Sequence, residues 1–449
     1  MSNAFYSATG CAQLERKSVF SFYARMIVAS LCLLAARTES SPLSENTYLN
    51  AVELLTTFSG ERAEQYEPFF QFSDETRIVG VEIHAAGTND TDARYLAGTE
   101  VWKQINNILR ITTADGFEGI SGVVSEHQGG FSNEHLLELQ GVTADLLALR
   151  TLDPVEVGTM LDRTRPDLSD ASRANIDIAL WDLAARRAGR PLYELLRAKR
   201  DSIEPYASLP FYDTLPEYVE AVNDYAKLGY RTFKFHVWGL IEEDSKLVKL
   251  IQQTFADSPY HFMIDLEGAY GFEDALRLGG EMDEPLFIWL EGPIDDKLLE
   301  QYRELKSRLA LPIIPAGYNI YSSEFIRQGI KTGSWDAGRF DATTIGGITK
   351  ALELLIIAND ADLSIELQSW GHSLAQVANL HLMLANERTR YFEASMPKEA
   401  YEFGMKNGNL LNQGQVVAPE GPGLGIEVDW DNLAMADFYI KIAAPKNIQ

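Results

Sequence analysis

The chain has 449 residues, 46% hydrophobic and 10% aromatic, which is enough apolar material for a large core and more than one domain. Its 65 acidic residues outnumber 39 basic ones, and the formal net charge of −26 argues against nucleic acid or an anionic membrane surface as a partner. Cys11 and Cys32 are its only cysteines, so the rest of the chain has no disulfide framework, cysteine metal site or cysteine nucleophile.

Near the N-terminus, an apolar run from Met26 to Ala36 follows Arg25. A run of this length is too short to cross a bilayer but is typical of the core of a signal peptide. The 25 residues that precede it are more than a signal peptide usually has there. We therefore expect residues 1–45 to be a disordered leader or appendage without a chemical role, and the protein to be cytoplasmic.

Residues 76–200 have the pattern of an α+β domain. From 76 to 120, apolar and polar residues alternate around turn signals, which predicts a small antiparallel sheet. Helical patterns follow, the clearest over 172–196, with a start at Ser172 and a stop at Gly189.

From 203 to 395 the chain alternates short strand patterns with helical ones. Helices are expected near 215–228, 243–256, 295–308 and 346–360. The strands are expected in "EPYASLP", "RTFKFHV", "HFMID", "PLFIWLE", "LPIIPAG", "DAGRFDA", "DLSIEL" and "RTRYFEA". Eight such units predict an α/β fold, a (β/α)8-type barrel of the modified TIM kind under an N-terminal α+β capping domain. Residues 411–449 are expected to return to the capping domain.

Ionisable residues stand at the predicted strand ends. In "YHFMIDLEGAYG", Asp265 and Glu267 are two positions apart, so in an extended strand their side chains leave on one face and repel unless a cation lies between them. The strand ends also carry Lys234, His236, Glu291, Asp341, His372 and Glu393. Barrel enzymes build their sites at these ends, and converging carboxylates suit Mg²⁺.

In these residues and the motifs around them, the chain resembles the enolase superfamily, in its mandelate racemase/muconate lactonizing enzyme-like branch. The resemblance covers about residues 76–440 and rests on these motifs: "IALWDLAARRAGRPLYELL", "FKFHVWG", "MIDLEGAY", "WLEGP", "GGIT", "HSLAQVANLHLMLA", "YFEA" and "GPGLGIEVDW". It implies one Mg²⁺ ion bound to an acid substrate, and removal of the proton α to the carboxylate to give an enediolate.

The expected metal ligands depart from the family pattern. Relatives take a third acidic ligand after the glycine of strand five, where this chain has Tyr318, a poor ligand for Mg²⁺. Our hypothesis is that Asp265, Glu267 and Glu291 hold the ion, with Asn319 or water filling in. The alternative is that Glu267 only pairs with Lys234 or a solvent cation.

The expected bases depart as well. His236 stands where relatives have a lysine base; it either accepts the α-proton, with a pKa lowered by Lys234, or only donates a hydrogen bond to substrate. Asp341 matches an aspartate that holds a strand-seven histidine in relatives. That histidine's usual place is occupied by Gln368, so either His372 completes the dyad or Gln368 only orients substrate.

Glu393 matches the acid of strand eight, which is expected to be protonated and to hydrogen-bond the substrate carboxylate, or else to partner Lys234. Further substrate contacts are expected from Tyr212, Tyr318, Asn319 and Gln368.

The favoured function is therefore that of a Mg²⁺-dependent lyase that dehydrates a sugar acid or related hydroxy acid. A racemase or epimerase, which needs a base on both faces of the substrate, is the first alternative. A Schiff-base aldolase that uses Lys234 and a catalytically impaired binding protein are the others. The expected partner is a small-molecule carboxylate, and relatives of this kind suggest a homo-oligomer.

Overall fold

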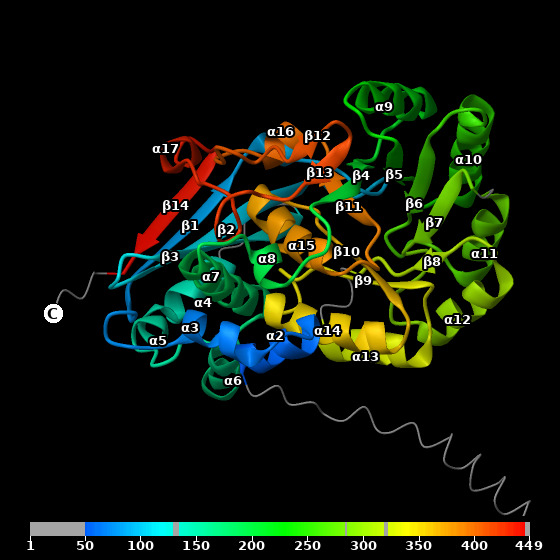
Figure 1. Ribbon diagram of the computed structural model, residues 1–449. Helices are drawn as coiled ribbons and strands as arrows, with labels where there is room; N and C mark the ends of the chain where they lie inside the picture. Colours follow the sequence, from blue (N-terminus) through cyan, green and yellow to red (C-terminus); the bar gives the residue numbers. More distant parts are fainter. Residues whose placement is uncertain (1–49, 129–133, 283–284, 318–321, 445–449) are drawn as a thin grey trace, which may run out of the picture. The chain divides into compact units, whose positions relative to one another are not determined.

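Within the described residues, four antiparallel strands form one sheet, and its edge strand comes from the C-terminal end of the chain (Figure 1). The computed structural model describes residues 50–128, 134–282, 285–317 and 322–444. The sheet order is β14-β1-β2-β3, with β1 (Ile78–Gly87), β2 (Trp102–Thr113), β3 (Glu118–Gln128) and β14 (Phe438–Ala443). The antiparallel sheet expected between residues 76 and 120 is therefore present.

A long helix, α7 (Asp170–Ala188), packs on this sheet. Its N-terminus is capped by the Ser169 side chain, which accepts a hydrogen bond from Ser172 N, so the helix begins two residues before the predicted start. Gly189 ends it with a φ of 64°, as predicted. The other helices here are α2 (Ala51–Ser59), α3 (Glu67–Phe70), α4 (Glu134–Gly141), α5 (Thr143–Leu147), α6 (Pro154–Thr164) and α8 (Leu192–Leu195), with short 3₁₀ turns η1 (Ala63–Gln65) and η2 (Asn89–Thr91).

In the part of the chain described between 202 and 395, eight strands alternate with helices, as predicted. The strands are β4 (Ser202–Leu209), β5 (Thr232–His236), β6 (His261–Asp265), β7 (Phe287–Glu291), β8 (Ile313–Ile314), β9 (Ala337–Phe340), β10 (Ser364–Leu367) and β11 (Tyr391–Ser395). The helices are α9 (Leu215–Lys227), α10 (Ile241–Phe255), α11 (Phe272–Glu281), α12 (Leu299–Arg308), α13 (Ser323–Thr332), α14 (Ile348–Asp360) and α15 (Ser373–Ala385). The fold is a (β/α)8-type barrel under a capping domain.

Most of the barrel is held by parallel strand ladders. β11 pairs with β4, the ladder continues in order to β8, and β9 pairs with β10. At the remaining two junctions individual hydrogen bonds take over: Asp336 N donates to Ile313 O at 3.0 Å, and Ser369 Oγ donates to Glu393 O at 2.9 Å. The ring of strands brings the ends of distant chain segments to one mouth.

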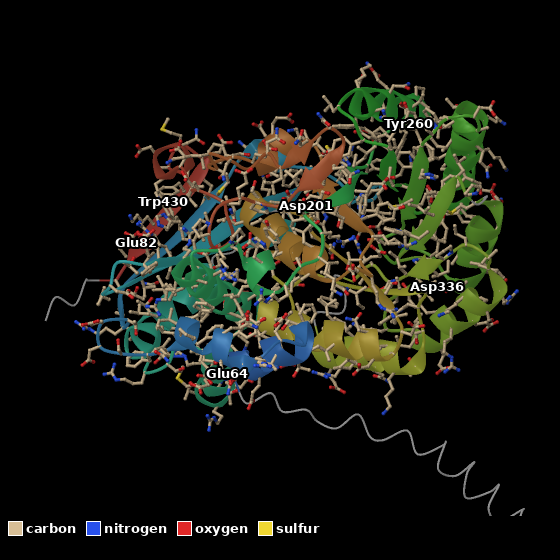
Figure 2. All side chains as sticks on the ribbon, in the orientation of Figure 1. Glu64, Glu82, Asp201, Tyr260, Asp336 and Trp430 are labelled. Atoms are coloured by element: carbon tan, nitrogen blue, oxygen red, sulfur yellow. The ribbon has the colours of Figure 1, made fainter. Side chains whose placement is uncertain are left out.

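The C-terminal segment crosses back over both parts. It contains α16 (Lys398–Tyr401), β12 (Leu411–Asn412), β13 (Gln415–Val417), α17 (Trp430–Leu433) and β14. Leu424 N donates to the buried Asp182 of α7 at 2.6 Å. Beside β14, the guanidinium of Arg110 lies over the Trp430 ring and pairs with Glu82 at 2.8 Å. Figure 2 labels Glu82 and Trp430, on the left of the view. These contacts fix the sheet edge that β14 completes.

Among the described residues, no helix is long and apolar enough to cross a membrane. The segment expected to be a leader or appendage, residues 1–45, lies outside the described residues.

Candidate active site

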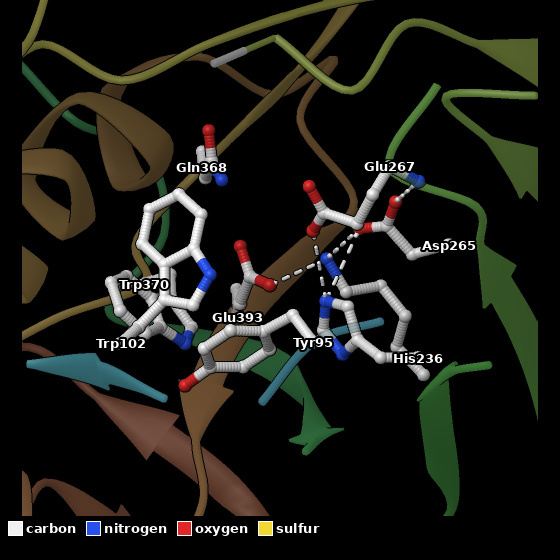
Figure 3. Close-up of a pocket in the computed structure, with 9 residues that line it drawn as sticks. Tyr95, Trp102, His236, Asp265, Glu267, Gln368, Trp370 and Glu393 are labelled. Atoms are coloured by element: carbon white, nitrogen blue, oxygen red, sulfur yellow. Dashed lines mark hydrogen bonds and ion pairs between the residues drawn. The ribbon is translucent and has the colours of Figure 1, made fainter. Parts of the chain in front are cut away.

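A pocket opens at the C-terminal ends of the barrel strands (Figure 3). Its lining combines residues of the capping domain with strand-end residues of the barrel: Tyr95, Trp102, Lys234, His236, Asp265, Glu267, Gln368, Trp370 and Glu393. The cavity volume is about 40 Å³.

In the floor of the pocket, Lys234 of β5 contacts three carboxylates. Its Nζ lies 3.0 Å from Asp265 Oδ2, 3.1 Å from Glu291 Oε1 and 2.7 Å from Glu393 Oε1. Glu291 and Glu393 raise the pKa of Lys234 well above its ordinary value, although burial acts in the opposite direction. Lys234 is therefore a permanent buried cation.

A second buried cation, Arg339 of β9, continues this network. Its Nε lies 2.7 Å from Glu291 Oε1, and an Nη atom lies 2.7 Å from Glu393 Oε2. The same nitrogen donates to the Tyr206 hydroxyl at 3.0 Å. Arg339 is absent from the sequence-based list of site residues. Its position could have revealed it, because Arg339 stands in β9 two residues before Asp341, which directly follows the strand and is itself expected at the site.

The two glutamates of the network titrate differently. Burial favours the neutral form of Glu393, but Lys234 and Arg339 outweigh it and hold the pKa of Glu393 at about 2. The contact of the alternative expectation, Glu393 as a partner of Lys234, is present at 2.7 Å, and these cations favour the ionised form of Glu393; its hydrogen bond to substrate stays a prediction. Burial raises the pKa of Glu291 to about 8 despite Arg339 and Lys234.

His236 ends β5 with both ring nitrogens engaged. Nδ1 lies 2.6 Å from Leu209 O, and because a carbonyl only accepts, Nδ1 carries the hydrogen. Nε2 then faces Asp265 Oδ2 at 3.5 Å and Glu267 Oε1 at 3.4 Å. Burial alone would lower the pKa of His236, but these two carboxylates raise it to about 9. The expected lowering by Lys234 is outweighed, so His236 is protonated at neutral pH.

The backbone after β6 turns Glu267 into the pocket. Glu267 has a φ of 51°, the left-handed region that a non-glycine residue seldom adopts, and Gly268 follows with 73°. The turn is held by Glu267 N, which donates to Asp265 Oδ1 at 3.1 Å, and by Gly268 N, which donates to Gly292 O at 2.8 Å. Both carboxylates therefore line the same pocket, as expected, but through this left-handed turn and not through the extended strand that the prediction assumes.

His236, Asp265 and Glu267 each offer a ligand atom within 4.8 Å of the others. The two carboxylates suit a hard divalent ion, whereas His236 Nε2 has no lone pair for a metal while it carries a proton. Glu291, the expected third carboxylate ligand, is not in this group, because its Oε1 contacts Lys234 and Arg339 and its Oε2 accepts from Trp289 Nε1 at 3.1 Å. Tyr318 and Asn319 lie outside the described residues.

The expected dyad of Asp341 with His372 is not formed. Asp341 Oδ1 accepts hydrogen bonds from Thr343 N at 2.7 Å and from Asn379 Nδ2 at 2.7 Å. His372 packs beside the Tyr401 ring, and its Nε2 has no hydrogen-bond partner among the described residues. The turn after β10 leaves His372 as the N-cap of α15, outside the pocket lining, whereas Gln368 is part of that lining.

Aromatic rings wall the pocket, but the expected Tyr212 is not one of them. Tyr212 packs against the Tyr218 ring, with centroids 5.1 Å apart, and is not among the residues that line the pocket. The capping wall is instead made by Tyr95 and Trp102, and Trp370 adds a ring from the barrel, 5.3 Å from that of Tyr95. No local pattern marked these rings as pocket residues, because their place depends on how the cap covers the barrel.

The fold and the pocket together define a capped-barrel protein with an acidic, cation-paired site at the barrel mouth. Residues 79–197 match the family model for the mandelate racemase/muconate lactonizing enzyme N-terminal domain, and residues 217–432 match that for the enolase C-terminal domain-like family. A crystal structure from Pseudovibrio sp., of a protein classed as a mandelate racemase/muconate lactonizing enzyme, is 32% identical. Its TM-score is 0.79, and the match covers 82% of this chain and 99% of that one. The chain belongs to this family of the enolase superfamily.

Two curated relatives of similar sequence have different activities. An o-succinylbenzoate synthase of Enterococcus faecalis is 27% identical over 75% of this chain and 91% of its own length. An L-talarate/galactarate dehydratase of Salmonella typhimurium is 29% identical over 63% of this chain and 73% of its own. A crystal structure of that dehydratase liganded with Mg and L-lyxarohydroxamate has a TM-score of 0.72, with 23% identity over 82% of this chain and 95% of that one.

Proposed function

We propose that the protein is a lyase that removes the proton α to the carboxylate of a sugar acid or related hydroxy acid and then expels the β-hydroxyl as water. Membership of the enolase superfamily supports the first step. The dehydratase relative supports the second. The substrate within this class is left open, since relatives below 30% identity carry different activities.

Dehydration is favoured over racemisation because the described part of the pocket has a histidine on one side only. Among the described pocket residues, His236 is the only histidine, and Figure 3 has the neutral amide of Gln368 on the far side of the pocket. Racemisation needs a proton-transfer group on both faces of the substrate carbon. Dehydration can use one group twice, as base for the α-proton and then as acid for the leaving hydroxyl.

His236 is built for this double role. The Nδ1 hydrogen bond to Leu209 O fixes the ring, so that Nε2 is the atom that exchanges protons with the pocket. Glu267, 3.4 Å away, favours the imidazolium after proton uptake. Because the resting imidazole is protonated at neutral pH, it has to lose that proton before it can accept one from substrate.

The substrate carboxylate is proposed to lie over Asp265 and Glu267. A divalent ion held by these carboxylates would bind substrate oxygens and stabilise the negative charge left by proton removal. Lys234 adds positive charge directly beneath the same position. A Schiff-base role for Lys234 is disfavoured, because its amine is kept protonated by three neighbouring carboxylates.

The test is α-proton exchange in D₂O, followed by NMR, together with dehydration across a panel of sugar acids with added Mg²⁺. His236→Gln should lower the exchange rate by about 10²–10⁴-fold, the usual contribution of a general base. The matched control is His261→Gln. His261 begins β6, at the end away from Asp265 and the pocket, so this variant should exchange α-protons at the wild-type rate. Exchange by His236→Gln at the wild-type rate, or none by wild type on any acid, would refute the proposal.

A further inference from the structure

Arg339 is the least expected member of the buried network. It stands on β9, inside the barrel and fully buried, and no ordinary surface function accounts for a guanidinium there. Its contacts are Glu291 at 2.7 Å, Glu393 at 2.7 Å and the Tyr206 hydroxyl at 3.0 Å. A buried guanidinium persists only when it is paired, so these contacts are structural requirements of the site.

The contacts of Glu291 differ from those of Glu267, whereas Asp265 shares with Glu291 the contact to Lys234. Its Oε1 lies between Arg339 Nε at 2.7 Å and Lys234 Nζ at 3.1 Å, and its Oε2 is used by Trp289. A divalent ion on Oε1 would have to share one oxygen with two cations. Glu267, in contrast, contacts the pocket-facing nitrogen of His236 and lines the cavity itself.

We propose that Arg339 is a positioning residue that holds Glu291 outside the coordination shell of the divalent ion and so keeps the affinity of the free protein for Mg²⁺ low. The ion is then held from the Asp265 and Glu267 side of the site. This inference rests on the divalent ion of the proposed function, but concerns binding in the absence of substrate.

The experiment is a calorimetric titration of Mg²⁺ into metal-stripped protein without substrate. Four proteins form a double-mutant cycle: wild type, Arg339→Gln, Glu291→Gln and the double variant. Arg339→Gln should raise the affinity for Mg²⁺ at least about tenfold, because Glu291 is released. Glu291→Gln alone should change it by less than about threefold, but should abolish the gain in the Arg339→Gln background.

Two controls separate this effect from a general loss of charge or of structure. Arg390→Gln removes a half-exposed guanidinium that pairs with Glu366 and should leave Mg²⁺ affinity unchanged. Arg339→Lys keeps the positive charge and should keep the affinity low. If Arg339→Gln does not fold, the comparison of wild type with Glu291→Gln still tests the proposal. The proposal requires that Glu291→Gln binds Mg²⁺ with the affinity of wild type.

The proposal is overturned if Glu291→Gln alone weakens Mg²⁺ binding as strongly as Asp265→Asn, because Glu291 would then be a ligand despite Arg339. It is also overturned if folded Arg339→Gln binds Mg²⁺ no better than wild type. Proton exchange is measured separately, so a protein that shows the expected binding cycle but exchanges no α-proton would refute the proposed function and leave this inference standing.

Discussion

Nε2 of His236 lies 3.4 Å from Glu267 Oε1, and this contact reverses the titration behaviour that the sequence suggests for the histidine. Lys234, two residues earlier, does act to lower the pKa of His236, but Asp265 and Glu267 outweigh it. The protonation state of the pocket therefore depends on a turn in another strand.

The first prediction concerns the titration of His236. In metal-free protein its imidazole should titrate near pH 9, as measured by NMR of the ring resonances. Because this pKa lies above the unfolded value of 6.5, the His236 contacts contribute stability that is complete below about pH 6.5 and is lost as the pH rises through about 9. Glu267→Gln should move the inflection to lower pH. An inflection at or below 6.5 in wild type would contradict the assignment.

The second prediction separates His372 from the chemistry. His372 is buried, burial lowers its pKa to about 4, and it does not contact Asp341. His372→Gln should therefore exchange substrate α-protons at a rate close to wild type, in the same D₂O assay that His236→Gln fails. The melting temperature of the variant shows whether it is folded. A loss as large as that of His236→Gln would restore the strand-seven dyad as a working pair.

The third prediction concerns the stability of the buried network. Lys234→Met leaves Glu291 and Glu393 paired only with Arg339, and Asp265 only with His236, and should lower the free energy of unfolding by about 3–5 kcal/mol. Urea denaturation measures this. The control is Lys246→Met, an exposed pair with Glu243, which should change the stability by less than about 1 kcal/mol. Equal effects of the two substitutions would mean that the network is not coupled to folding.

The fourth prediction concerns the contact between the capping domain and the barrel. Asp177 of α7 accepts from Thr349 N of α14 at 3.1 Å, and burial raises the pKa of Asp177 to about 7. The folded state then binds a proton that the unfolded chain, with a value of 3.8, does not hold between these two pH values. Asp177 thus contributes stability at low pH that is lost as the pH rises through about 7.

Asp177→Asn should remove this slope, which is at most about 1.4 kcal/mol per pH unit. The unfolding free energy of wild type minus that of the variant, measured from about pH 5 to pH 8, should therefore fall as the pH rises to about 7 and then level off. Parallel curves would show that Asp177 stays ionised in the folded protein.

Local sequence determined much of the molecule. Strand patterns and their spacing predict all eight barrel strands, because each strand is a short buried run bounded by turn residues. Asp265 and Glu267 both line the pocket, as expected, although Glu267 reaches it through a left-handed turn beyond β6. Strand-end position alone also identifies Lys234, His236 and Glu393 as pocket residues.

Tertiary structure decided the partners of these residues. Arg339 of β9 meets Glu291 of β7 and Glu393 of β11 across one intervening strand on each side, and these contacts set the charge of the network. His372 is four residues beyond Gln368, yet the turn before α15 takes it away from Asp341. The local sequence determines which side chains stand near a strand end, because the positions of strands and turns follow from local patterns. Charge and pKa depend on distances across the barrel, which no local spacing contains.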